Sequence, residues 1–327
     1  MLPHPPHPSR AALPCVWLMP LALQVACATD AATSGKAPTA LTTATDAAAA
    51  VSPDPEPMAM PTVKPESELH ELVGADWELE PNTEKYICVW QTMTETVYFD
   101  QSRGLSPVGT HHVVLSLSDD PLQPDGIREC DVATVGTHNV SGGGVGTRSR
   151  ILPPGVAVKL PAGSQLLLNL HLFNASDEPL RGRSGTLIKA VDEKDVSVLT
   201  DAMIAGTTTL NVPPGRSTTT GKCTISQELT VFSVFPHMHQ TGVALQAVAH
   251  TAARGDVVLF DGPYDFDDQQ FYRIEMLPLK PGDVVDVTCT YENPRNQTLH
   301  WGGSSLDEMC QAGLGRIPAG GPSLCTK

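Results

Sequence analysis

The sequence is poor in aromatic residues and in positive charge, and each shortage excludes a class of protein. Aromatic residues make up 5% of its 327 residues and charged residues 17%, whereas glycine and proline number 27 and 29. Such a composition argues against long helices and coiled coils and suits short strands joined by turns. Lys and Arg total 21 against 36 Asp and Glu, a formal charge of -15. We therefore expect no nucleic-acid partner, because an acidic chain is repelled by phosphates.

The N-terminal apolar run is too short for a comfortable membrane span. It covers residues 11–26, whereas a spanning helix needs about 20 apolar residues. We predict a signal peptide over residues 1–27 and an exported protein. Cys27 follows Ala26 and fits either the region of cleavage or the lipid-modified cysteine of a bacterial lipoprotein, and only such an anchor would bring the chain to a membrane. Residues 28–70 are rich in Ala, Thr and Pro and predict a flexible linker.

Short apolar runs closed by turn residues replace the linker pattern from about Trp77 onward. Leu229–Phe235 and Val284–Thr290 are examples, rich in β-branched residues and bounded by Gly, Pro or Asn. No run of more than about ten residues keeps a helical period. The pattern predicts an all-β chain of antiparallel β-sandwiches. A turn phrase that recurs at Leu152 and Val212 divides it into two tandem domains, residues 71–205 and 206–327.

The eight cysteines favour disulfides over a metal site. Cys15 and Cys27 lie in the leader, and the other six divide evenly, two in the first predicted domain and four in the second. No pair has the spacing of a zinc knuckle. Disulfides within each domain suit an exported protein. Spacing alone leaves several pairings open for these six, Cys88, Cys130, Cys223, Cys289, Cys310 and Cys325.

Three groups of histidines carry the chemistry of the sequence. His237 and His239 are separated by one residue after an apolar strand, so both imidazoles can reach one metal ion from the same side. His111 and His112 are neighbours, which point to opposite faces of a regular strand. They can share an ion only at a strand end, at a bulge, or through different ring nitrogens. His171 lies in an apolar strand and needs a partner, because an unpaired buried imidazole is costly.

A methionine completes one of these groups. Met309 is the third ligand that we select for His237 and His239, and a soft thioether favours copper, particularly Cu(I). Taken alone, a core histidine is more often structural and a methionine more often fills a gap. The combination favours a metal site.

These motifs, in this order, resemble the copper type II, ascorbate-dependent monooxygenases, the group that includes peptidylglycine α-hydroxylating monooxygenase and dopamine β-monooxygenase. The resemblance covers about residues 80–315, and the Gly302–Cys310 stretch, GGSSLDEMC, is its most specific part. The matching segments are Tyr86–Val89, Thr110–Leu115, Ile151–Val156, Leu168–Phe173, Pro213–Arg216, Gly221–Cys223, Phe235–Gly242, Cys289–Asn293 and His300–Cys310.

The resemblance implies a fold, two metal sites and a reaction. Family members have two jelly-roll-like β-sandwich domains, each holding one copper ion across a solvent-filled cleft. The first copper stores and passes an electron, and the second binds dioxygen and hydroxylates a substrate C–H bond. An ascorbate-like reductant supplies the electrons. Carried over residue by residue, the first site would be His111, His112 and His171, and the second His237, His239 and Met309. The implied disulfides are Cys88–Cys130, Cys289–Cys310 and Cys223–Cys325.

Two departures bear on the substrate. Phe235 stands where the peptide-amidating members have the arginine that grips a carboxylate, and Gly313 stands where they have a tyrosine. A bidentate carboxylate clamp is therefore missing at this position, and the two residues suit an apolar or aromatic small molecule. We predict an exported dicopper monooxygenase that hydroxylates a small organic substrate with dioxygen. The alternatives are a copper-buffering protein on the same scaffold and a purely structural β-sandwich module, in which the six candidate ligands would be scattered.

Overall fold

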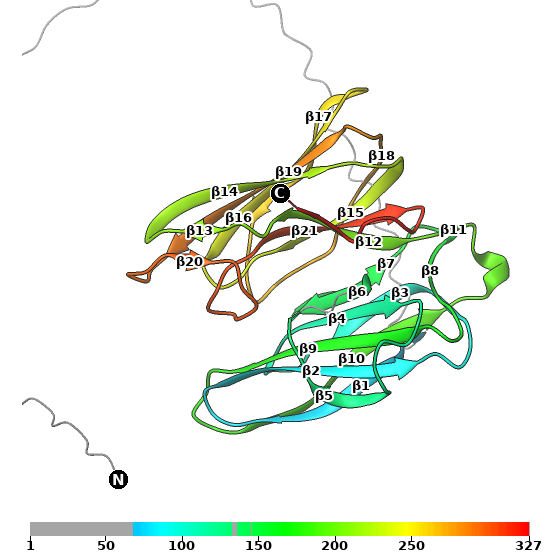
Figure 1. Ribbon diagram of the computed structural model, residues 1–327, viewed down its shortest axis with the longest axis horizontal. Helices are drawn as coiled ribbons and strands as arrows, with labels where there is room; N and C mark the ends of the chain where they lie inside the picture. Colours follow the sequence, from blue (N-terminus) through cyan, green and yellow to red (C-terminus); the bar gives the residue numbers. More distant parts are fainter. Residues whose placement is uncertain (1–67, 133–135, 145, 327) are drawn as a thin grey trace, which may run out of the picture. The chain divides into compact units, whose positions relative to one another are not determined.

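The prediction of an all-β fold is confirmed. In the computed structural model, the described residues are 68–132, 136–144 and 146–326, all within one compact unit, Pro61–Lys327. In these ranges the chain forms strands and short turns such as the 3-10 turn η2 (Glu193–Asp195), without an α-helix (Figure 1). None of the described segments forms a helix long and apolar enough to cross a membrane. The predicted signal peptide, Cys27 and residues 28–67 of the predicted linker lie outside the described residues.

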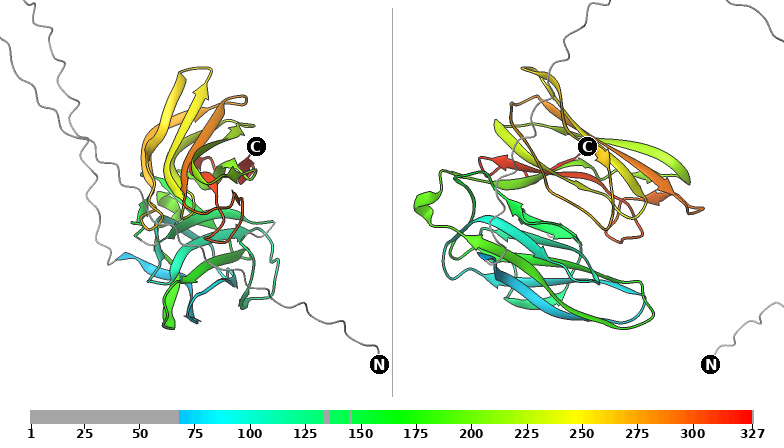
Figure 2. Two further views of the ribbon diagram at one scale, coloured as in Figure 1. Left: turned by 90° about the vertical axis from the view of Figure 1, so that its left-hand side faces the viewer. Right: turned by 180° about the vertical axis from the view of Figure 1, so that it is seen from behind.

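The first part of the chain forms two sheets, coloured cyan to green in Figure 2. One sheet has the order β1-β10-β3-β8-β11, with β7 paired to β3, and the other has the order β5-β2-β9-β4-β6. All pairings are antiparallel except β8 with β11. The strands are β1 (His70–Leu79), β2 (Thr83–Thr92), β3 (Val97–Leu105), β4 (Thr110–Ser118), β5 (Gly126–Glu129), β6 (His138–Gly144), β7 (Arg150–Ile151), β8 (Val156–Leu160), β9 (Gln165–Asn174), β10 (Leu180–Ala190) and β11 (Val198–Leu199).

The second part forms a five-stranded sheet, a four-stranded sheet and a two-stranded ladder. Their orders are β18-β15-β21-β12-β22, β14-β19-β16-β17 and β13-β20, and only β12 with β22 is parallel. β12 spans the predicted domain boundary between residues 205 and 206. The strands are β12 (Asp201–Thr207), β13 (Asn211–Val212), β14 (Gly215–Thr224), β15 (Leu229–His237), β16 (Gly242–Thr251), β17 (Gly255–Pro263), β18 (Tyr272–Leu279), β19 (Val284–Asn293), β20 (Leu299–His300), β21 (Cys310–Ile317) and β22 (Leu324–Thr326).

Each pair of large sheets encloses a core of its own. In the first, Val73 of β1 and Phe99 of β3 pack with Leu115 of β4 and Leu168 of β9. In the second, β15 and β21 supply Val234 and Leu314, which share a core with residues of the other sheet. Phe232 of β15 belongs to the first core. The antiparallel sandwich arrangement is thus present in both parts, and the jelly-roll connectivity stays a prediction.

Strand β9 shows how the apolar pattern places a histidine. Leu166, Leu168, Leu170 and Leu172 alternate toward the first core. Asn169 and His171 alternate to the opposite face, because successive side chains of a strand point to opposite sides. β9 lies between β2 and β4, and His171 is aligned with Tyr86 on one side and with His112 on the other. The strand is therefore buried on both faces, one apolar and one polar.

Three disulfides close the two parts of the chain. They join Cys88 to Cys130, Cys223 to Cys325, and Cys289 to Cys310. These are the pairings that the family resemblance implied. Three such bonds indicate that the chain matures in an oxidising compartment.

Candidate metal centre

Three of the predicted ligands meet on the polar face of the β2–β9–β4 sheet. His111, His112 and His171 each offer one ring nitrogen, and these nitrogens all lie within 4.8 Å of one another. His111 and His171 are 5% and 0% exposed. The sheet register shifts between Thr110 and His112, so His111 is the extra residue of a β-bulge. The bulge turns both neighbouring imidazoles toward His171, which a regular strand could not do.

The nitrogens that face each other in this group are Nδ1 atoms. His111 Nδ1 and His171 Nδ1 lie 2.9 Å apart, and the Nδ1 of His112 is buried without a hydrogen-bond partner. An unpartnered buried nitrogen is costly, and a cation shared by the three rings would satisfy the Nδ1 of His112. The chemistry of this donor set fits one copper ion bound through three imidazoles.

His237 and His239 form the second group, at the end of β15 and just beyond it. Their ring centroids are 5.4 Å apart. His237 Nδ1 lies 2.9 Å from Gln269 Oε1, and His239 Nδ1 lies 3.3 Å from the carbonyl oxygen of Asp307. With both Nδ1–H groups donating to oxygen, the Nε2 atoms keep their lone pairs. The Nε2 of His239 is buried and unpartnered, which again fits a metal ion.

Met309 is brought to this group by a buried carboxylate. The same oxygen of Glu308, Oε2, accepts hydrogen bonds from the backbone N–H groups of His239 and Met309 at 3.0 and 3.2 Å. Its other oxygen accepts from the N–H and the hydroxyl of Thr241. Met309 is 5% exposed, and Tyr291 donates a hydrogen bond to its carbonyl oxygen. The structure thus holds the backbones of His239 and Met309 together, although 70 residues of sequence separate them.

The two groups of histidines form one continuous cluster. The ring centroids of His111 and His239 lie 5.8 Å apart, and those of His112 and His237 are also 5.8 Å apart. The family resemblance implied a solvent-filled cleft between the two sites, whereas here the rings of the two groups are near neighbours. Gln269 lies between them, with Oε1 toward His237 and Nε2 3.5 Å from His111 Nε2.

Burial favours the neutral form of four of these imidazoles, His111, His112, His237 and His239. It lowers the pKa of His239 to about 3, with a further contribution from His237. Burial is also the largest cause of the lowered pKa values of His111, His112 and His237. A neutral imidazole has the lone pair that a metal ion needs, so the cluster can bind a cation at neutral pH without first losing protons.

The proposed substrate-pocket residues lie on two neighbouring strands, Phe235 on β15, which also carries His237, and Gly313 on β21. Phe235 is aligned with Gly313 of β21, and its ring lies 4.5 Å from that of Phe271. A Cβ atom added to Gly313 would meet only atoms of Phe235, at ordinary contact distance. The guanidinium of Arg150 lies 5.6 Å from the Phe271 ring. Phe235 and Phe271 thus form an aromatic pair on the strand face of His237, and Gly313 adds no side chain next to Phe235.

Glu84, Gln269 and Glu308 are the site residues that the sequence did not reveal. Each supports a candidate histidine that lies at least 32 residues away in sequence, so no spacing marks the pair. Glu308 had the best signal, because it lies inside the GGSSLDEMC stretch. Glu84 and Gln269 belong to no motif.

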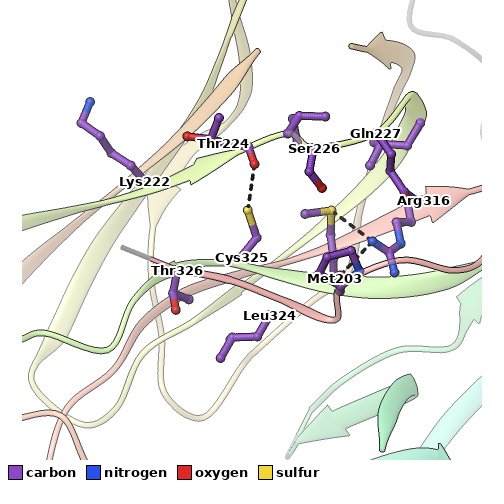
Figure 3. A pocket seen from close by; sticks show the side chains of 12 residues that line it. Met203, Lys222, Thr224, Ser226, Gln227, Arg316, Leu324, Cys325 and Thr326 are labelled. Atoms are coloured by element: carbon purple, nitrogen blue, oxygen red, sulfur yellow. Dashed lines mark hydrogen bonds between the residues drawn. The ribbon is translucent and has the colours of Figure 1, made fainter. Parts of the chain in front are cut away.

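A pocket of about 270 Å³ lies away from the histidines, beside the Cys223–Cys325 disulfide (Figure 3). Its most polar wall is Arg316, whose guanidinium binds both oxygens of Asp201 and the carbonyl oxygens of Gly321 and Pro322. The remaining N–H points to the sulfur of Met203. Arg316 has no N–H left for an anion, and the pocket holds none of the candidate ligands.

Comparison with known proteins agrees with the geometry. Residues 195–315 match the family described as "Copper type II ascorbate-dependent monooxygenase, C-terminal domain". The chain is 26% identical over 240 residues to the human "Putative DBH-like monooxygenase protein 2", covering 66% of the chain and 48% of the relative. It is 27% identical over 227 residues to "DBH-like monooxygenase protein 2" of Mus musculus, covering 61% and 36%. The chain therefore spans about half or less of these relatives.

One solved structure has a weak similarity to this chain. It is the crystal structure of dimeric latent PorU from Porphyromonas gingivalis, with a TM-score of 0.17 and 9% identity, covering 72% of this chain and 24% of that one. A likeness of this size carries no argument about fold or function.

Proposed function

We propose that the chain is a member of the copper type II ascorbate-dependent monooxygenase family, to which its residues 195–315 are similar, and that it is an exported enzyme that binds two copper ions. It hydroxylates a C–H bond of a small organic substrate with dioxygen and an ascorbate-like one-electron reductant. The observation that carries this proposal is the set of unpartnered nitrogens. His112 Nδ1 and His239 Nε2 are buried without a partner, one in each group of histidines.

The two groups differ in donor chemistry, as two different tasks require. The first offers three imidazoles, His111, His112 and His171, which suit an ion that cycles between Cu(I) and Cu(II). The second adds the thioether of Met309 to His237 and His239, and a soft ligand favours Cu(I). Copper bound by these residues would supply one-electron transfer at the first group and dioxygen activation at the second.

The chain's own contribution is orientation and the exclusion of water. Gln269 and the Asp307 carbonyl hold the Nδ1–H groups of His237 and His239, which directs both Nε2 atoms to one side. Glu308 fixes the backbone on which His239 and Met309 sit. Phe235 and Phe271 beside His237 would contact an apolar or aromatic substrate. Preorganised ligands of this kind bind without the cost of ordering flexible side chains.

Product formation tests the proposal. The copper-loaded chain, incubated with ascorbate, ¹⁸O-labelled dioxygen and a panel of small aromatic and aliphatic compounds, should yield a hydroxylated product with one labelled oxygen atom. The metal-free chain is the control and should yield none. Stable binding of two copper ions without product or oxygen consumption would favour the copper-buffering alternative. The structural-module alternative required scattered ligand candidates, whereas the five imidazoles lie in one cluster.

The proposal has two further parts, the export of the chain and the fate of Cys27. The disulfides support maturation outside the cytoplasm. Mass spectrometry of the mature chain would show whether Cys27 is removed, retained or lipid-modified.

A further inference from the structure

Glu84 binds three partners that belong to both parts of the chain. Its Oε1 lies 2.6 Å from His171 Nε2 and 2.8 Å from the backbone nitrogen of Ser305, and its Oε2 lies 2.7 Å from the hydroxyl oxygen of Ser304. The carboxylate of Glu84 therefore directs its acceptor positions at His171 and at one loop.

Tyr86 repeats this double contact two residues further along β2. Its ring stacks on the ring of His171, with centroids 4.2 Å apart and planes 9° from parallel. Its hydroxyl donates a hydrogen bond to the carbonyl oxygen of Gly303. Glu84 and Tyr86 point to the same side of the strand, and both join His171 to the Gly303–Ser305 segment.

The segment held by Glu84 leads directly to the second group of ligands. Ser304 and Ser305 are followed closely by Glu308, which binds the backbone N–H groups of His239 and Met309. Ser304 also accepts a hydrogen bond from the backbone of Leu306 and, through its carbonyl, from that of Asp307. An unbroken series of hydrogen bonds and short chain segments therefore connects His171 with Met309, and Glu84 is the point at which it crosses from one sandwich to the other.

We propose that Glu84 is a positioning residue for both candidate copper sites. At the first site it accepts the Nε2–H of His171, so that the Nδ1 lone pair faces the ion and the imidazole becomes more basic. At the second site it anchors the Gly303–Ser305 segment and thereby the loop that presents Met309. The copper part of this inference rests on the proposed function, whereas the anchoring part does not need a metal ion.

The copper arm of the test compares Glu84→Gln with Ser304→Ala. Glu84→Gln keeps the size of the side chain and removes its charge, and it should weaken Cu(I) at the first site by about 10–100-fold, the usual cost of losing such a partner. Competition with a Cu(I) chelator measures the affinity, and the electron paramagnetic resonance spectrum of Cu(II) reports the geometry. Ser304→Ala leaves the contact between Glu84 and His171 intact, so it should keep the first-site affinity of the unmodified chain.

The metal-free arm measures hydrogen exchange along the Gly302–Met309 segment. The amide of Ser305 donates to Glu84, so Glu84→Ala, which removes the acceptor, should speed its exchange, and that of its neighbours, by tenfold or more (about 1.4 kcal/mol). Ser304→Ala should speed exchange in the same segment to a smaller extent. Amides in β16 and β17 serve as the folding control and should be unchanged in both variants.

The two arms separate this inference from the proposed function. If the unmodified chain binds no copper, the proposed function fails, while the exchange experiment still decides the anchoring role. Unchanged Cu(I) affinity in Glu84→Gln would overturn the role toward His171. Unchanged exchange at Ser305 would overturn the role toward the loop.

Discussion

Three of the candidate ligands are each held at one ring nitrogen by a hydrogen bond, which leaves the other nitrogen free. His171 is held at Nε2 by Glu84, and His237 and His239 are held at Nδ1 by Gln269 and the Asp307 carbonyl. The hydrogen bond made by one ring nitrogen sets the tautomer and so determines which nitrogen is free. In the proposed sites His171 would offer Nδ1, whereas His237 and His239 would offer Nε2, a difference that the spacing of histidines in the sequence does not contain.

Replacing the methionine should affect one site and spare the other. Met309→Ala removes the soft ligand, so Cu(I) at the second site should weaken by at least the roughly 10-fold that even an indirect partner contributes. The first site should keep its copper, since its donors are three imidazoles. Chelator titration followed by metal analysis measures the two occupancies. An equal loss at both sites would contradict the assignment of Met309 to His237 and His239.

The metal-free chain should lose stability as the pH falls below neutrality. Unfolded histidines titrate near pH 6.5, whereas burial lowers the pKa of His239 to about 3 and also lowers those of His111, His112 and His237. Below about pH 6.5 the unfolded state therefore takes up protons that the folded state does not. The free energy of unfolding should fall by up to about 1.4 kcal/mol per pH unit for each such imidazole.

Urea titrations at pH 7.5, 6.0 and 5.0 measure this slope. Well above pH 7 these imidazoles should add no pH dependence to the free energy of unfolding. At low pH the dependence from each imidazole should end when the pH reaches its folded-state pKa. His239→Asn removes one imidazole and should make the slope shallower. A stability that is flat between pH 7 and pH 5 would show that the buried histidines titrate normally.

At the scale of elements, strand periodicity and bulges decide where the ligands face. The alternation in β9 could be read from the sequence, because four leucines at every second position mark the core face and leave His171 on the other. The bulge at His111 could not be predicted with certainty. From the sequence it was one of three ways in which His111 and His112 could share an ion. The sequence does not say which condition holds, because a bulge depends on pairing with β9, more than 50 residues away.

The supporting residues could not be predicted for the same reason. Glu84 contacts Ser304 across 220 residues, and Glu308 contacts His239 across 69. Both are ordinary carboxylates in sequence, and only the packing of distant strands gives them partners. The candidate metal ligands could be named from the sequence because histidine and methionine are uncommon residues and occur here in a recognisable order.

A close approach between strands makes one glycine intolerant of a side chain. A Cβ atom at Gly221 of β14 would lie 2.2 Å from the backbone carbon of Gly206 in β12. Gly221→Ala should therefore destabilise the chain by about 1–3 kcal/mol, as overpacking does. Gly313→Ala is the control, because its Cβ atom would meet Phe235 no closer than 3.5 Å. Chemical denaturation compares the two, and equal stability of both variants would contradict this account of the strand packing.

At the scale of the whole molecule, two sandwiches and three disulfides hold one cluster of histidines together. The all-β class and the disulfide pairs agree with expectation, the first from turn-rich composition and the second from family resemblance. The direct neighbourhood of the two histidine groups was not expected. It depends on contacts between the two parts of the chain, such as Tyr86 with Gly303 and Thr147 with Gln269, which leave no pattern in the sequence.

Two disulfides should differ in their consequences for the site. The Cys223–Cys325 bond links residues 102 apart and lies beside the pocket of Figure 3. Replacing both cysteines by alanine should cost about 2–5 kcal/mol and leave copper binding intact. The Cys289–Cys310 bond adjoins Met309, so the same replacement there should also weaken Cu(I) at the second site. Denaturation and chelator titration together measure both effects, and unaltered Cu(I) affinity in both double variants would contradict the second expectation.

The central claim is that the two histidine groups hold two copper ions that act together in oxygen chemistry. Metal analysis of the copper-loaded chain, combined with oxygen uptake in the presence of ascorbate, tests it most directly. We predict two copper ions per chain and an oxygen uptake that requires both the metal and the reductant. One copper ion or none per chain would contradict the two-site account.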